Sequence, residues 1–282
     1  VPKISLYLYT RGGDTAAAWN IINLLRQYCD ELQVIIPHKA HSAGTLISIG
    51  ANSIIMTKQA TLGPIDPSIN TPLNPQIPNN PIATMPVSVE AVKGYLEFAK
   101  EELSIKDDIA LANILIKLSD TVHPLVLGNV YRSRAQIKML AEKLLINQVT
   151  DSTKIKQIID FLCSDSGSHD YTINRREAKN TLGLNIIKPD EELYKLIKSV
   201  YDNISAELGF GEILDPRSMI ESNNGEYTVK RGIVESLSGG SNMFVSQGKI
   251  TLQQIDTPAG TQQQINDNRI FEGWRQEANA PQ

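Results

Sequence analysis

Ser42 stands in the segment HSAGT, which follows a short buried-type apolar run and opens an apolar stretch with helical spacing. Small residues let the backbone turn sharply at such a point. They also place the serine hydroxyl where unpaired backbone N–H groups and the helix dipole favour a developing negative charge. Those are the surroundings of a nucleophile that attacks a carbonyl group. Taken alone, however, the segment favours a structural role, because serine commonly caps the first turn of a helix.

A second pair of candidates is Gly12 and Gly13 in TRGGD, which also follow a strand-like run and precede a helical one. The C-terminal ends of parallel strands meet at one edge of a sheet, so the two turns should face each other. One turn can supply N–H donors to an oxyanion while the other presents the nucleophile. An ordinary turn in which Asp14 caps the next helix explains the same residues equally well.

The elements that would position these turns alternate between strand and helix over the first third of the chain. Such alternation predicts parallel βαβ units with right-handed crossovers, and therefore an α/β fold. The apolar patterns place the strands at 4–9, 32–36 and 53–56 and the helices at 16–28 and 42–51.

Residues 64–86 hold seven prolines, too many for regular structure, and predict an extended loop that lines or covers a site. A helical layer follows the sheet. Its helices are expected at 88–103, 106–121, 124–147, 153–164, 174–183 and 189–208. Alternating residues after Glu226 predict an antiparallel hairpin. The chain thus divides into a domain at 1–208, a hairpin appendage at 209–257 and a polar tail at 258–282.

Composition limits the function classes. With 282 residues, 41% of them hydrophobic, the chain can form one large α/β domain and a smaller appendage. A net charge of −4 gives no basic field for a phosphate backbone, so no nucleic acid partner is expected. The two cysteines lie outside any disulfide or zinc pattern, which fits the cytoplasm. The chain enters a strand almost directly after Val1, so a membrane anchor or first strand could lie upstream.

A family resemblance emerges from three consecutive segments: LYLYTRGGDT, VIIPHKAHSAGTLISIGAN and IIMTKQATLGPIDPSI. Together they resemble the core of the ClpP/SppA clan, and they are most similar to the SppA-related family called serine dehydrogenase proteinase. The later segment SHDYTINRREAKNTLGL is similar to that family as well. The resemblance covers roughly residues 4–200. It implies a ClpP/crotonase-like spiral ββα core and serine peptidase chemistry.

Carried over to this chain, the resemblance makes Ser42 the nucleophile. It gives the oxyanion-hole positions to the N–H groups of Gly12, Gly13 and Ala43. Arg11 replaces the proline usual before the glycine pair and adds a positive charge there. The histidine that serves ClpP as general base has no counterpart, because Ile65 or Asp66 stands at its position.

SppA enzymes instead use a lysine as general base, and a lysine kept neutral by burial can accept the serine proton. Lys93, on the expected helix 88–103, is the leading candidate, although it also fits the solvent face of that helix. Lys100 and Lys58 are weaker candidates. His169, followed by Asp170, offers a Ser-His-Asp alternative, and its structural reading is a surface turn before a helix.

The remaining polar residues have modest expected roles. Asp66, in GPIDP, should fix a turn and could orient substrate. His41 should point away from Ser42 if the chain is extended there, as a structural residue or a wall of the site. His38 and His123 have no partner pattern. No metal site and no cofactor are therefore expected.

Three functions compete. The first is a peptidase that acts on peptide or protein substrates through an acyl-enzyme. The second is an inactive scaffold of the same fold that self-assembles and presents the hairpin to a partner. The third is a crotonase-like acyl-CoA enzyme, which explains the glycine turns but leaves Ser42 without a role. The resemblance also implies a homo-oligomer with the helical layer as its interface.

Overall fold

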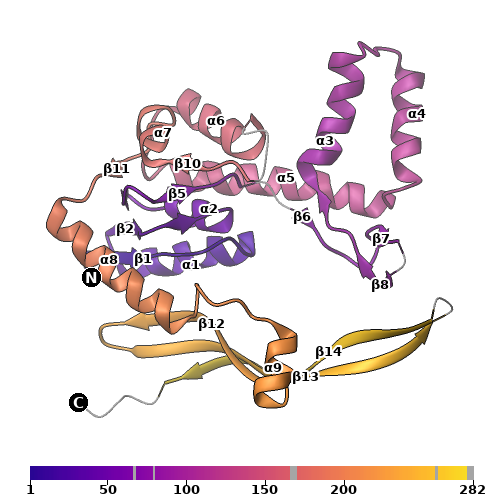
Figure 1. Ribbon diagram of the computed structural model, residues 1–282. Helices are drawn as coiled ribbons and strands as arrows, with labels where there is room; N and C mark the ends of the chain where they lie inside the picture. Colours follow the sequence, from indigo (N-terminus) through magenta and orange to yellow (C-terminus); the bar gives the residue numbers. More distant parts are fainter. Residues whose placement is uncertain (66–67, 79, 166–169, 258–259, 278–282) are drawn as a thin grey trace. The chain divides into compact units, whose positions relative to one another are not determined.

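The computed structural model describes residues 1–65, 68–78, 80–165, 170–257 and 260–277 (Figure 1). It forms two compact units, Val1–Tyr194 and Lys195–Gln282, so the division falls inside the last long helix, upstream of the expected limit at residue 208. Within the described residues no single helix is long and apolar enough to cross a membrane. The pair Asp108–Ser119 and Pro124–Leu145 meets that criterion only together, with a bend of 105°.

A four-stranded parallel sheet forms the centre of the first unit, in the order β1-β2-β4-β11. Its strands are β1 (Lys3–Tyr7), β2 (Glu31–Ile36), β4 (Ser53–Met56) and β11 (Ile186–Ile187). Except for Ile35, which is partly buried, the apolar side chains of β2 and β4 are buried, as expected for strands covered on both faces. Each contributes about 1.5–3 kcal/mol by leaving water. The predicted α/β class is confirmed, with β11 added by a segment that has no strand signal.

Two helices connect these strands and pack on the sheet: α1 (Thr15–Tyr28) and α2 (Ala43–Ile49). A second, smaller sheet lies beside α2, in the order β10-β5-β3. It consists of β3 (Lys39–Ala40), β5 (Thr61–Leu62) and β10 (Ile173–Asn174). Strands of two residues carry no periodicity, so the sequence could not reveal this sheet.

The proline-rich segment is more regular than the loop predicted for 64–86. Its strand β6 (Ser68–Ile69) pairs with β9 (Val87–Ser88), which directly follows the segment, and β7 (Gln76–Ile77) pairs with β8 (Asn80–Thr84) within it, both antiparallel. The buried Asn74 links the two sides, because its amide donates to the carbonyls of Ile69 at 2.6 Å and Met85 at 2.9 Å. A side chain thus makes the connections that prolines cannot make through the backbone.

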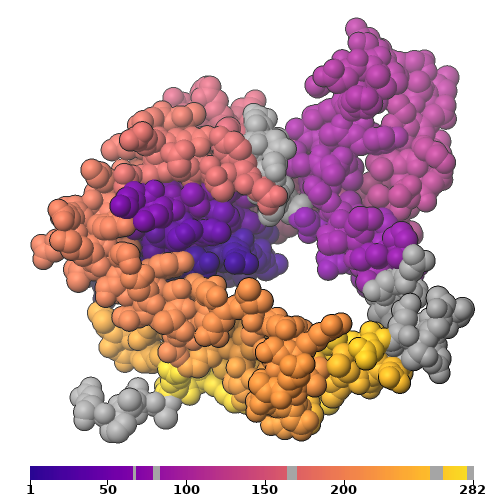
Figure 2. Space-filling view, viewed as in Figure 1, coloured from indigo at the N-terminus to yellow at the C-terminus, as the bar shows by residue number. Residues whose placement is uncertain are grey.

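The helical layer follows, and its longest member, α5, contributes to two cores. Ile137 and Leu144 pack in the main core, whereas Val126 and Val130 form a second cluster with Val89. The layer consists of α3 (Val89–Glu97) with a π-helical turn at Phe98–Glu102, α4 (Asp108–Ser119), α5 (Pro124–Leu145), α6 (Ser152–Asp160) with a π-helical turn at Phe161–Asp165, α7 (Arg175–Asn180) and α8 (Glu191–Glu207). In Figure 2 the surface over α3 and α4 is hollowed between the two helices.

The second unit holds a short helix, α9 (Pro216–Asn223), and an antiparallel sheet of β12 (Glu226–Ser236), β13 (Gly240–Thr257) and β14 (Gly260–Gln276). The predicted hairpin is confirmed as β12 and β13. The tail predicted at 258–282 is wrong for residues 260–276, which form β14. Pairing with β13 explains why this segment forms a strand. The rings of Trp274 and Phe244 meet edge-on with their centres 5.4 Å apart, and Glu272 accepts a hydrogen bond from Ser246 at 2.8 Å.

Candidate active site

Two turns that lie thirty residues apart in the sequence are joined by backbone hydrogen bonds. Thr10 forms a parallel bridge with Ala40. The Thr10 N–H donates to the carbonyl of Lys39 at 2.9 Å, and the His41 N–H donates back to the carbonyl of Thr10 at 3.2 Å. The glycine turn that follows Thr10 is thereby held against Ser42, as the convergence of parallel strands predicts.

Gly12 lies so close to Ser42 that a side chain would not fit without adjustment. A Cβ at Gly12 would be 3.1 Å from the Ser42 Cβ and 3.5 Å from its Oγ. The φ of Gly12, +135°, also lies in the region that only glycine adopts readily. Gly13 differs, because a Cβ placed there would meet nothing within 4 Å. Gly12 therefore sets the close approach, and Gly13 borders open space.

Helix α2 is buried along its whole length and fixed at both ends. At its start, a Cβ on Gly44 would lie only 2.4 Å from Thr10 Cγ2, so the approach of the two turns requires glycine. The Thr45 hydroxyl lies 2.9 Å and 2.7 Å from the carbonyl oxygens of Ala40 and Gly63, and it accepts the Gly63 N–H at 3.0 Å. At the far end, the Gln148 amide donates to the carbonyls of the last turn.

Ser42 occupies the capping position of α2 but does not act as a cap. Its side chain forms no capping hydrogen bond, unlike Asp14 on α1, whose carboxylate accepts the Ala17 N–H at 2.7 Å. Its backbone has φ +51° and ψ −114°, a conformation that costs a residue other than glycine about 1–3 kcal/mol. Strain of this kind persists where the surrounding structure imposes it. Ser42 therefore does not have the capping role that its sequence context also allowed.

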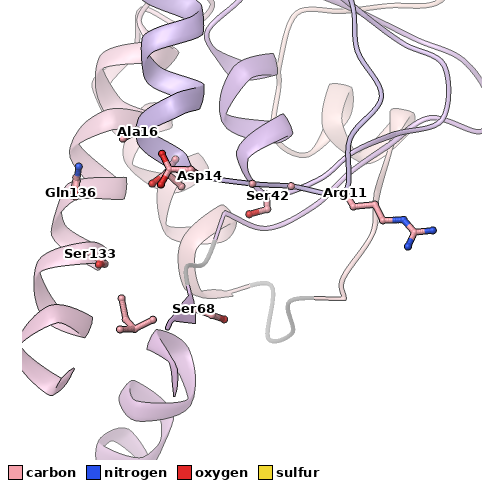
Figure 3. A pocket seen from close by; sticks show the side chains of 11 residues that line it. Arg11, Asp14, Ala16, Ser42, Ser68, Ser133 and Gln136 are labelled. Carbon is pink, nitrogen blue, oxygen red and sulfur yellow. The ribbon is translucent and has the colours of Figure 1, made fainter. Parts of the chain in front are cut away.

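A cavity of about 630 Å³ opens in front of Ser42. Its walls come from the β1–α1 turn and the first turn of α1, from α2, from β6 and from α5. The lining residues are Arg11, Gly12, Gly13, Asp14, Thr15, Ala16, Ser42, Ser68, Ile69, Ser133 and Gln136. In Figure 3, Asp14, Ser133 and Gln136 lie on one side of Ser42, and the Arg11 side chain points to the other side.

The backbone donors near Ser42 fall into two groups. The Gly12 N–H donates to Thr10 Oγ1 at 3.1 Å, so this donor, predicted for the oxyanion hole, is already used. The N–H groups of Gly13 and Ala43 have no hydrogen-bond partner among the described residues. Unpaired N–H groups beside a strained serine provide the kind of donors that an oxyanion requires.

The lysines considered as bases lie elsewhere. Lys93 Nζ is 3.3 Å from a carboxylate oxygen of Glu97 and 3.8 Å from one of Glu90, and it lines a different cavity, as does Lys100. Lys58 lies over the ring of Tyr194, 5.4 Å from its centre. None of the three lines the Ser42 cavity in the described part of the chain.

The remaining titratable groups of the described residues bring no base into contact with Ser42 either. His41 turns towards β5, where its Nε2 lies 2.8 Å from Thr61 Oγ1, in agreement with the prediction that it points away. His169 and Asp66 lie outside the described residues. Burial raises the pKa of Cys163 to about 12, so this thiol stays protonated. The described residues contain no group of three or more His, Cys, Asp or Glu that could hold a metal ion.

Sequence reasoning missed Thr10, Ser133 and Gln136. Thr10 receives its role from the bridge to Ala40, which no local pattern reveals. Ser133 and Gln136 are one helical turn apart on α5, between the buried residues Val130 and Ile137. Polar residues between inward-facing apolar ones were the available signal, but nothing in the sequence relates α5 to Ser42.

Residues 2–207 match the family described as ClpP-like SDH-type serine proteinases. The chain belongs to this family. The predicted resemblance is thereby confirmed, and the match includes the elements that carry Ser42, the glycine turn and α5.

Two relatives of this chain come from Methanocaldococcus jannaschii. The uncharacterized protein MJ0137 is 32% identical over 196 residues, which are 69% of this chain and 57% of that protein. The uncharacterized protein MJ1495 is 29% identical over 223 residues, 78% of this chain and 64% of that protein. The chain thus spans less than two thirds of the length of either relative.

The solved structures to which this chain is similar include two mutants of the 1510-N membrane-bound stomatin-specific protease, one of them in complex with a substrate peptide. Their TM-scores are 0.38 and 0.39 at 17% identity. The alignments cover 67% of this chain and 62% and 66% of theirs.

Proposed function

We propose that this SDH-type proteinase hydrolyses peptide bonds, with Ser42 as the nucleophile. The observation that carries the proposal is the state of the Ser42 side chain: it sits at a helix N-terminus, makes no cap and faces a cavity. A catalytic serine needs a free hydroxyl in a fixed position, and the strained backbone of Ser42 together with the buried helix α2 provides both.

The reaction would follow the usual course of acyl transfer. Ser42 Oγ attacks the carbonyl carbon of the scissile bond, and its proton passes to a general base. The carbonyl oxygen becomes an oxyanion, for which the N–H groups of Gly13 and Ala43 are the candidate donors. The tetrahedral intermediate then collapses, the amine leaves with the proton, and an ester to Ser42 remains. Water hydrolyses this ester and restores the serine.

The general base stays a prediction: a lysine, as in SppA, or His169. The ion pairs of Lys93 do not support it as the base, and His169 lies outside the described residues. A pH profile of kcat/KM separates the two chemistries. A histidine base gives a loss of activity below about pH 6.5, whereas a lysine base moves this limit according to how far its surroundings lower its pKa.

Hydrolysis of an unfolded protein or a quenched fluorescent peptide tests the proposal. We expect Ser42→Ala to lower the rate by about a thousandfold or more with an unchanged melting temperature, since a serine nucleophile is not replaceable. Equal hydrolysis by both forms would exclude Ser42. A chain that folds and assembles but cleaves no peptide would instead support the scaffold function.

A further inference from the structure

One wall of the Ser42 cavity is polar and is contributed by two distant segments. Asp14 follows the glycine turn, whereas Ser133 and Gln136 belong to α5 and lie on one face of it because they are three residues apart. In Figure 3 these three side chains are on the same side of Ser42. None of them is needed to hold Ser42 or α2 in place, since the contacts of Thr10, Thr45 and Gln148 do this.

The charge on this wall is negative. Among the described residues that line the cavity, Asp14 and Arg11 are the charged ones, and the Arg11 side chain points away from the wall. One carboxylate oxygen of Asp14 caps α1. A carboxylate has about four acceptor positions, so the other oxygen is available to a ligand. Asp14 forms no ion pair with any other described residue.

We propose that Asp14, Ser133 and Gln136 form a subsite for a basic side chain, Lys or Arg, of the peptide substrate. This inference rests on the proposed function. The side chain would belong to the residue whose carbonyl Ser42 attacks, because Asp14 directly follows Gly13, the candidate oxyanion donor. Asp14 supplies the opposite charge, and the Ser133 hydroxyl and the Gln136 carbonyl oxygen accept hydrogen bonds from the ammonium or guanidinium group. The cavity of about 630 Å³ is large enough for a long side chain and its neighbours.

Two peptides that differ only in charge test the subsite: one with lysine and one with norleucine at the position before the scissile bond. The measured quantity is the ratio of their kcat/KM values. We expect the wild-type chain to prefer lysine by about two- to fivefold, the size of a partly exposed ion pair. Asp14→Asn should bring the ratio close to one, and Asn still caps α1. Gln136→Glu should raise the ratio, since it adds a second negative charge.

The matched control is Asp107→Asn. Asp107 caps α4 with the same 2.7 Å hydrogen bond and does not line the cavity, so this change should leave the ratio as it is. Cleavage that depends on Ser42 but shows a ratio near one, or a ratio unaffected by Asp14→Asn, would overturn the subsite and leave the proposed function intact. If neither peptide, nor any unfolded protein, is cleaved in a Ser42-dependent manner, both the function and the subsite are overturned.

Discussion

Two cavities in the first unit are each lined by a residue with catalytic potential, Ser42 in one and Lys93 in the other, and the two side chains differ in their contacts. Ser42 faces a cavity of about 630 Å³ with free backbone donors and polar walls. Lys93 lines a cavity of about 320 Å³ between α3, α4 and α5, where most of its neighbours are apolar. The serine makes no capping bond, whereas the lysine is paired with Glu90 and Glu97 on its own helix.

This difference shows what residue type alone leaves open. A serine before a helix and a lysine on a helix each have a common structural use, capping and surface ion pairing. Lys93 forms ion pairs on its helix, whereas Ser42 does not cap the helix that it precedes. What separates them is the surrounding structure: the positive φ and the buried first turn of α2 keep the Ser42 hydroxyl out of its capping position.

The largest effect that would sharpen this comparison is expected from Gly12→Ala. The new Cβ would lie 3.1 Å from Ser42 Cβ, in a backbone conformation that disfavours alanine. A displacement of about 1 Å at the nucleophile can cost a hundredfold in rate, and we expect at least this loss in kcat/KM for a peptide. Gly94→Ala, in α3 beside Lys93, is the control. Its Cβ would meet nothing within 4 Å, so activity should persist and stability should rise by up to about 1 kcal/mol. Equal losses of kcat/KM in both variants would contradict a special role for the surroundings of Ser42.

A smaller effect is expected from Thr45→Val, which removes the hydroxyl that joins α2 to Ala40 and Gly63. Buried partners left without a hydrogen bond should lower the free energy of unfolding by about 1–3 kcal/mol, measured by denaturant titration. Thr45→Ser keeps the hydroxyl and loses a methyl group, so it should cost only about 1 kcal/mol. If valine is tolerated better than serine, the hydroxyl does not hold the start of α2.

The smallest effect is expected from Lys93→Ala. Its ion pairs are partly exposed and should contribute less than about 1 kcal/mol to stability. Because Lys93 does not line the Ser42 cavity, we expect kcat/KM to remain within about twofold of the wild-type value. A hundredfold loss of kcat with an unchanged melting temperature would restore Lys93 as the general base and break the comparison.

The parts of the fold that the sequence predicted are those with a strong local pattern. The run LQVII and the capped helix after Asp14 specify their structures within a few residues. The two-residue strands β3, β5 and β10 depend on partners far along the chain, so local patterns could not reveal them. For β14 the Gln- and Asn-rich composition even indicated a tail.

The site was predictable in the same uneven way. Convergence of parallel strands sufficed to bring Gly12 against Ser42 and Gly13 to the border of the same cavity. Ser133 and Gln136 line the cavity because α5, about ninety residues after Ser42 in the sequence, forms one of its walls. The position of α5 depends on its packing in both hydrophobic cores. The roles predicted for His169 and Asp66 stay predictions, since both lie outside the described residues.

The most direct test of the central claim is the reaction of the folded chain with a fluorophosphonate, followed by mass spectrometry of its peptides. A serine activated for attack on a carbonyl group also attacks phosphorus, whereas a capping serine does not. We expect one adduct, on the peptide that contains Ser42, and none in Ser42→Ala or in the unfolded wild-type chain. An adduct that persists in Ser42→Ala, or a folded wild-type chain that remains unmodified while a serine protease in the same solution reacts, would contradict the assignment of Ser42 as the nucleophile.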